Sequence, residues 1–215
     1  MNVTKKVLCI FCSMIVMVSA CLPAQAQSNN QLNVYFDEFF FSTSDYGSRN
    51  VTVQYANEED TEIATILDAD TAEVLEVMMV VPQEATTRGV YPYTYIRKST
   101  VGDTELQLSI NVELYNEGSF RQINSIEGYY LGINTTSCGS YLEGQNVNVW
   151  PKNHILPSIQ LFYAYNGTLT VEIDTTLESS LEVELPGFGY SFSHSIGLYN
   201  YYRQTFNRSG TINLY

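Results

Sequence analysis

Three carboxylates in the C-terminal part of the chain have the spacing with the clearest chemical meaning. Glu172 and Asp174 are two residues apart, and Glu178 follows shortly after them. Residues two apart on a β-strand share one face, so Glu172 and Asp174 would be neighbours. Two carboxylates about 5.5 Å apart serve retaining glycosidases as nucleophile and acid. The spacing predicts either such a pair or, more simply, the solvated face of a strand.

This spacing resembles the Glu-x-Asp-x-x-Glu strand motif of laminarinase-like jelly-roll glycosidases. The resemblance implies that the acid and the nucleophile are among Glu172, Asp174 and Glu178. The chain departs from the motif because Glu178 comes one residue late, and Trp150 is its only Trp, whereas those enzymes line their clefts with aromatic platforms. We favour the solvated strand face and keep a secreted, glycosidase-like hydrolase as the alternative function.

Other catalytic or metal-binding arrangements are disfavoured. Cys138 precedes the only two histidines, His154 and His194, an order similar to that of Cys-His cell-wall endopeptidases. In those enzymes the cysteine begins a helix, which lowers its pKa, whereas the residues around Cys138 have the composition of a loop. We therefore expect an inert thiol, and the scattered His and Cys residues predict no zinc site.

Asp68, Asp70 and Glu73 have oxygen ligands that calcium prefers, but the EF-hand pattern with its central glycine is missing. A surface turn is the interpretation that we favour for them. The chain also contains no glycine-rich phosphate loop and no dinucleotide fingerprint. We therefore expect no metal and no cofactor.

Tyrosine-rich segments are the candidates for binding. Tyr91, Tyr93 and Tyr95 alternate along one segment, and Tyr199 and Tyr201 belong to a second aromatic group. Exposed aromatic rings stack on sugar rings or pack against the apolar surface of a protein partner. We predict a binding surface at these tyrosines. The alternative is a half-buried strand whose rings pack in the core.

The N-terminus is typical of a bacterial signal peptide. Lys5 and Lys6 precede an apolar stretch of about 14 residues, too short to span a bilayer, and an Ala-Gln-Ala site ends at Ala26. We predict cleavage after Ala26 and export from the cell. The segment Val18-Ser19-Ala20-Cys21 resembles a lipobox, so the alternative is a lipid anchor on Cys21 that holds the protein on the outer face of the membrane.

The predicted mature chain is strongly acidic. Of the ten basic residues two belong to the leader, and all 23 acidic residues follow it, so the net charge is 8 − 23 = −15. This charge would repel polyanions, which disfavours nucleic-acid binding. No mature segment has a run of about 18 apolar residues, so no transmembrane span is expected. The predicted partner is a glycan or a protein at the cell surface.

Period-two alternation of apolar residues dominates the mature chain and predicts an all-β fold. The segment from Glu105 to Leu114 shows it best, with every second residue apolar. Asn166-Gly167 predicts a hairpin turn. Residues 67–74 predict a second hairpin, or alternatively a short helix capped by Asp70. Regular short strands and turn signals indicate an antiparallel β-sandwich without long helices.

The charge changes near residue 87, which divides the mature chain into an acidic β region (27–87) with a polar linker and a sandwich-like domain (88–215). One continuous sandwich is the alternative. The C-terminal part, from Thr86 onward, is similar in style to uncharacterised exported β proteins of Gram-positive gut bacteria, a resemblance that implies localisation and fold class only. We therefore predict a non-enzymatic extracellular or cell-surface binding module.

Overall fold

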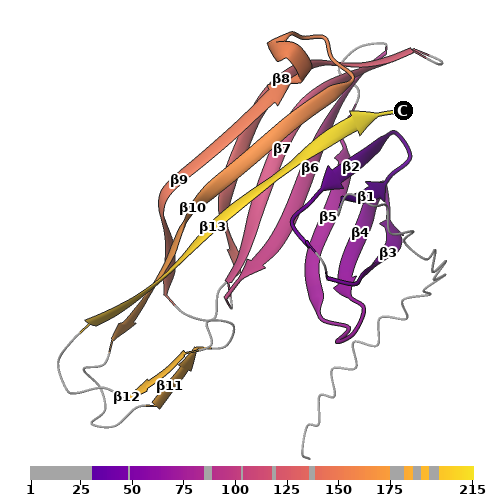
Figure 1. Cartoon of the computed structure of the whole chain (residues 1–215). Coiled ribbons are helices and arrows are strands. Elements are labelled where there is room, and N and C mark those ends of the chain that lie inside the picture. The colour runs from indigo at the N-terminus through magenta and orange to yellow at the C-terminus, as the bar shows by residue number, and fades with distance from the viewer. Residues whose placement is uncertain are drawn as a thin grey trace, which may run out of the picture.

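The computed structural model of the chain describes residues 31–47, 49–84, 89–102, 104–117, 120–135, 139–174, 182–185, 190–193 and 199–215 (Figure 1). The predicted leader, with Cys21 and Ala26, lies outside these ranges, and so do Cys138, Glu178 and His194. Among the described residues, no helix has the length and apolar character needed to cross a membrane.

Nearly all described residues belong to antiparallel strands, which confirms the predicted all-β sandwich. One sheet has five strands, in the spatial order β1 (Leu32–Tyr35), β2 (Phe39–Thr43), β13 (Tyr199–Leu214), β10 (Gln160–Asp174) and β9 (Ser140–Pro151). The other has six strands in chain order, namely β3 (Val51–Glu58), β4 (Thr61–Asp68), β5 (Val74–Pro82), β6 (Val90–Val101), β7 (Thr104–Glu117) and β8 (Phe120–Thr135).

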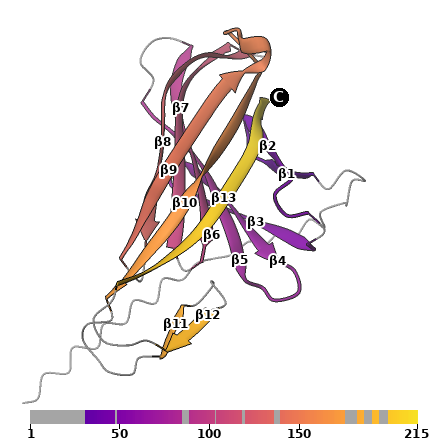
Figure 2. The ribbon, with the colours of Figure 1, turned by 60° about the vertical axis from the view of Figure 1, so that its left-hand side comes forward.

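Two small elements complete the described structure. A separate hairpin is formed by β11 (Glu182–Leu185) and β12 (Tyr190–Ser193), which lie between β10 and β13 in the chain. A single 3-10 turn, η1 (Lys152–His154), follows β9. Figure 2 shows β9, β10 and β13 running side by side along the length of the molecule.

The core lies between the two sheets and follows the predicted alternation. The five apolar residues of β7 all point inward and are at most 2% exposed, namely Leu106, Leu108, Ile110, Val112 and Leu114. Leu161, Tyr163 and Tyr165 of β10 meet them from the other sheet and are equally buried. A strand with one face on the core and the other in water produces this pattern.

Alternation fails where the opposing sheet does not extend far enough to cover a side chain. Tyr55 is 38% exposed on the edge strand β3, although it shares a face with the buried Val53. Its hydroxyl accepts a hydrogen bond at 3.2 Å from the backbone N–H of Tyr35 on β1. Ile159, which is two residues from the buried Leu161 and would share its face in a regular strand, is 59% exposed just before β10. Period-two alternation from the buried neighbours therefore does not give the burial of these two residues.

The predicted hairpin over residues 67–74 is confirmed. The Asp68 N–H donates to the Glu73 carbonyl, which links the ends of β4 and β5. The Asp68 carboxylate accepts the backbone N–H groups of Asp70 and Thr71 at 2.9 and 3.1 Å. These bonds lower the pKa of Asp68. The acidic residues therefore tie a turn, and no group of three metal-ligand side chains occurs among the described residues.

The predicted hairpin at Asn166-Gly167 was wrong, because β10 continues through both residues. Opposite Gly167, β9 contains a bulge that includes Gly144 at φ 58°. A Cβ at Gly167 would lie 3.0 Å from the ring of Phe206 and 3.3 Å from the Gln145 Cα. Glycine is therefore needed here for close approach of neighbouring groups, one of its uses in strands, and not for a turn.

The ranges 27–87 and 88–215 contribute to the same sheets. β2 pairs with β13 in the five-stranded sheet, and β5 pairs with β6 in the six-stranded sheet. Phe39 of β2 packs edge-on against Tyr95 of β6, with ring centroids 4.9 Å apart. The described strands of the two ranges thus pair within the same two sheets.

Candidate binding surface

The predicted row of tyrosines on β6 runs from the rim of the sandwich into its core. Tyr91 is 38% exposed, Tyr93 is half-buried, and Tyr95 is only 2% exposed. Tyr95 lies between Phe39 and Phe41, whose ring centroids are 4.9 and 5.3 Å away. Tyr95 therefore packs in the core, because the alternation that aligns these rings directs them toward the other sheet, whereas Tyr91 stays exposed at the rim.

Tyr95→Phe should stabilise the protein by about 1 kcal/mol at neutral pH. The Tyr95 hydroxyl is buried without a hydrogen-bond partner among the described residues, and such a group costs about 1–3 kcal/mol. Burial also raises the pKa of Tyr95 well above its ordinary value. The folded chain thus keeps this proton above about pH 10, where the unfolded chain loses it. The free energy of unfolding therefore falls as the pH rises in this range. Tyr95→Phe removes the titrating group and should make this fall smaller.

Urea unfolding between pH 7 and 11 measures both effects. Tyr163→Phe is the matched control, because the Tyr163 hydroxyl accepts a hydrogen bond from Arg97 and its removal should destabilise the fold at neutral pH. Equal destabilisation by both variants would contradict the assignment of Tyr95 as an unpaired core phenol.

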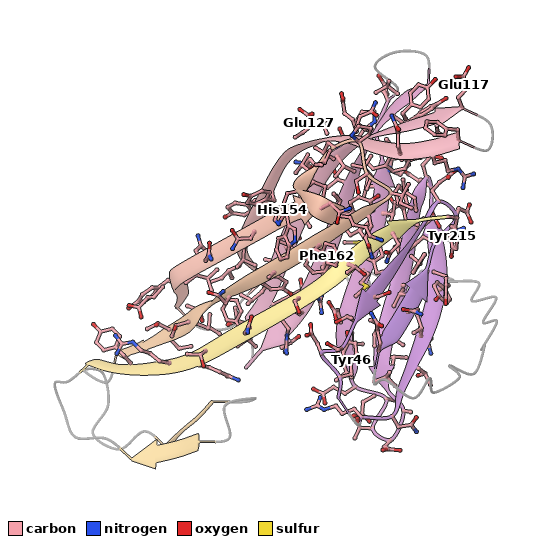
Figure 3. All side chains as sticks on the ribbon, turned by 45° about the horizontal axis from the view of Figure 1, so that its top comes forward. Tyr46, Glu117, Glu127, His154, Phe162 and Tyr215 are labelled. Atoms are coloured by element: carbon pink, nitrogen blue, oxygen red, sulfur yellow. The ribbon has the colours of Figure 1, made fainter. Side chains whose placement is uncertain are left out.

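A buried ionic cluster joins the two sheets, and sequence analysis did not predict it. Arg97 on β6 is 5% exposed and forms ion pairs with Glu76 on β5 and, at 2.7 Å, with Asp45 after β2. Its Nη1 donates to the Tyr163 hydroxyl on β10 at 2.9 Å, and Tyr46 donates to Glu76. We call these five residues the Arg97 cluster; Figure 3 labels Tyr46.

The Arg97 cluster is saturated by its own members. The guanidinium makes two hydrogen bonds to Glu76, and it also lies over the Tyr163 and Tyr165 rings at 5.6 and 5.8 Å. Burial raises the pKa of Tyr163 to about 12 against the lowering effect of Arg97, so the phenol is neutral at pH 7. Such mutual pairing is typical of a structural network. The only signal in the sequence was a charged residue at an inward position, Glu76 on β5 and Arg97 on β6.

The outer face of the five-stranded sheet, which we call the five-stranded face, brings together the polar and aromatic side chains best suited to a ligand. Three exposed asparagines lie directly opposite one another on adjacent strands, namely Asn146 on β9, Asn166 on β10 and Asn207 on β13. We call them the amide row. Strands are about 4.8 Å apart, so the row presents closely spaced amide donors and acceptors.

One end of the five-stranded face carries Tyr201, which is the most exposed of the predicted binding tyrosines whose side chains the structure describes. Its ring is 48% exposed and lies 5.8 Å from the Arg203 guanidinium. Arg203 pairs with Glu143 at 3.1 Å, and Thr170 donates to the same carboxylate at 2.8 Å. Both hydrogen bonds lower the pKa of Glu143, and the bond from Thr170 has the larger effect. Tyr141 on β9 is 39% exposed beside them.

A second aromatic group lies on the other side of the amide row. Trp150 of β9 stacks on Phe162 of β10, with ring centroids 5.9 Å apart and planes inclined by 18°. Phe162 precedes Asn166 by four residues, and Thr170 follows Asn166 by four. At about 3.4 Å per residue, the Trp150–Phe162 stack lies about 14 Å from the amide row, and Tyr201, which precedes Asn207 by six residues, lies about 20 Å from it. Amides therefore alternate with aromatic rings along one sheet face.

The remaining predicted residues lie at the far end of β10 or beyond the described ranges. The backbones of Glu172 and Asp174 pair with those of Tyr201 and Tyr199, but these side chains, except that of Tyr201, are outside the described set, as is Glu178. The hydrolase alternative therefore remains a prediction. His154 is exposed in η1. A hollow of about 380 Å³ beside η1 has no carboxylate in its lining, so it does not hold the pair that a glycosidase needs.

Comparison with known proteins adds no relative: no protein-family model, no curated protein and no solved structure matches the chain.

Proposed function

We propose that the protein is an exported, non-enzymatic binding module that recognises a neutral glycan through the five-stranded face. The observation that carries the proposal is the amide row between two aromatic groups. Aromatic rings offer flat apolar surfaces with little conformational entropy to lose. Amides supply both donors and acceptors without a charge. A sugar chain has the complementary combination of apolar ring faces and hydroxyl groups.

The charge of the protein favours a neutral ligand. The predicted mature chain has a net charge of −15, which would repel glycans rich in uronate or phosphate. Within the group around Tyr201, the exposed Arg203 is already paired with Glu143, so it adds no unpaired positive charge for an anionic ligand. Export, predicted from the leader, would place the five-stranded face where such glycans occur.

Removing an aromatic ring or an amide from this face should weaken glycan binding by at least about tenfold, equivalent to about 1.4 kcal/mol. The mature chain is first screened against an array of neutral oligosaccharides, with uronate-containing oligosaccharides as a second set. Binding of the best neutral oligosaccharide is then measured by calorimetry for Tyr201→Ala, Trp150→Ala and Asn166→Ala.

The control is Asn57→Ala, which removes an exposed amide from β3 of the other sheet and should leave the affinity unchanged. Each variant is checked for unchanged unfolding, so that a loss of affinity is not a loss of fold. The proposal fails if no neutral oligosaccharide binds, or if the three variants on the five-stranded face bind as tightly as the original chain.

A further inference from the structure

From Val77 to Val81, the strand β5 is apolar on both of its faces, unlike β7. Met78 and Val80 point into the core and are at most 1% exposed. The residues between and beside them, Val77, Met79 and Val81, point to the opposite side and remain partly exposed. A strand that reads as a continuous apolar run is typical of a sheet covered on both faces. The five-stranded sheet covers only the inner face of β5.

Neighbouring strands extend this apolar surface across the six-stranded sheet. Strand register places one continuous row on its outer face, consisting of Ala56, Ile63, Met79, Ile96, Ser109 and Tyr130. Ile63, Met79 and Ile96 are adjacent in this row and each is partly exposed. We call the surface formed by this row and its flanking residues Val77 and Val81 the apolar face.

No acidic side chain lies among Ile63, Ile96, Val77, Met79 and Val81 at the centre of the apolar face, whereas Glu58 lies at its β3 edge. At its edge, Tyr130 is 67% exposed and its ring lies over Gly132, where a Cβ would be 2.6 Å from the hydroxyl. On one side of the Met79 row lies a row that contains Val77, Lys98 and Gln107. On the other side lies a row that contains Val81 and Thr94. A chain with 23 acidic residues thus leaves the centre of the apolar face free of negative charge.

The size of this face meets the lower limit of a specific interface. Its rows extend about 24 Å across six strands and about 14 Å along them between residue centres. With side chains included, two such faces in contact would bury roughly 1,000–1,200 Å² in total, near the smallest area found in specific complexes. Two sheets with apolar faces pack at about 10 Å with their strands inclined by about 30°.

We propose that two copies of this chain associate through their apolar faces, with the twofold axis near Met79. Charge argues for this face in particular, because two copies that each carry −15 repel one another at every acidic surface, and the acid-free centre of the apolar face is where they can approach. In a twofold interface the same residues meet on both copies, so Ile63 and Ile96 would flank the axis on each side. The dimer would leave both five-stranded faces pointing outward and available to ligand.

Light scattering and sedimentation velocity on the mature chain, over about 1–200 μM, test the proposal. We expect a dimer that becomes tighter as salt is raised from about 20 to 300 mM, because salt screens the repulsion between like-charged copies. Met79→Glu introduces two carboxylates at the axis, one from each copy, and should weaken the dimer at least about a hundredfold.

The control is Thr205→Glu, which adds the same charge at an exposed position on the five-stranded face and should leave the dimer intact. Unfolding curves verify that both variants fold. A monomer at every concentration and salt would overturn the proposal, and so would a dimer that Met79→Glu leaves unchanged. Equal weakening by both variants would also overturn it, since charge alone would then account for the effect. None of these outcomes depends on glycan binding.

Discussion

Arg97→Met is expected to lower the free energy of unfolding by about 3–5 kcal/mol, the largest effect that we predict for a single substitution. The change leaves Glu76, which is 3% exposed, without its cationic partner. A buried carboxylate that has lost its partner carries a desolvation cost that nothing offsets. The Tyr163 hydroxyl also loses its donor. Urea unfolding at pH 7 measures the change.

Two comparisons make this expectation specific to a buried pair. Arg203→Met removes the same side chain from the exposed pair with Glu143 and should cost at most about 1 kcal/mol, as surface ion pairs do. The double variant Arg97→Met/Glu76→Met should be more stable than Arg97→Met alone, since it removes the uncompensated charge. An Arg97→Met effect as small as that of Arg203→Met would show that the Arg97 cluster does not hold the sheets together.

Gly210→Ala should destabilise the fold by about 1–3 kcal/mol through overpacking. Gly210 on β13 lies directly opposite Tyr163 on β10. A Cβ there would lie 2.6 Å from the Tyr163 Cζ and 2.9 Å from the backbone oxygen of Ser42. The ring cannot move away without breaking its hydrogen bond with Arg97. The loss would therefore reach the Arg97 cluster as well as the local packing.

Gly128→Ala is the matched substitution on β8. A Cβ at Gly128 meets no atom within 4 Å, and the backbone has no positive φ. Alanine restricts the unfolded chain more than glycine does, so this variant should be neutral or up to about 1 kcal/mol more stable. Thermal or urea unfolding of the two variants side by side checks the difference. Similar destabilisation by both would contradict the packing described for Gly210.

Local patterns predicted the strands well because they depend on neighbouring residues only. The alternation on β7 requires one face in water and one face in the core, so it identified every second residue from Leu106 to Leu114 as core. The Asp68 turn was predictable because its side chain bonds to backbone groups two and three residues ahead. Both signals are complete within about ten residues of chain.

Signals that depend on a partner strand were misread or missed. Asn166-Gly167 has the composition of a turn, but the bulge on β9 and the Phe206 ring from β13 decide its use. The Tyr95 ring belongs to an alternating row, but Phe39 and Phe41, more than 50 residues earlier, enclose it. The amide row was equally hidden, because Asn146, Asn166 and Asn207 meet only through strand register.

The sequence by itself determined the fold class, the inward positions of β7 and the Asp68 turn, because backbone pleating and turn chemistry act over short distances. Only the tertiary structure decided which strands are neighbours, as in the pairing of β2 with β13 across about 170 residues. Packing of the two sheets converts inward charges into the Arg97 cluster, and the pairing of β10 with β9 and β13 brings scattered asparagines into one row. The physical reason is that burial and proximity belong to the packed sheets and not to any one segment.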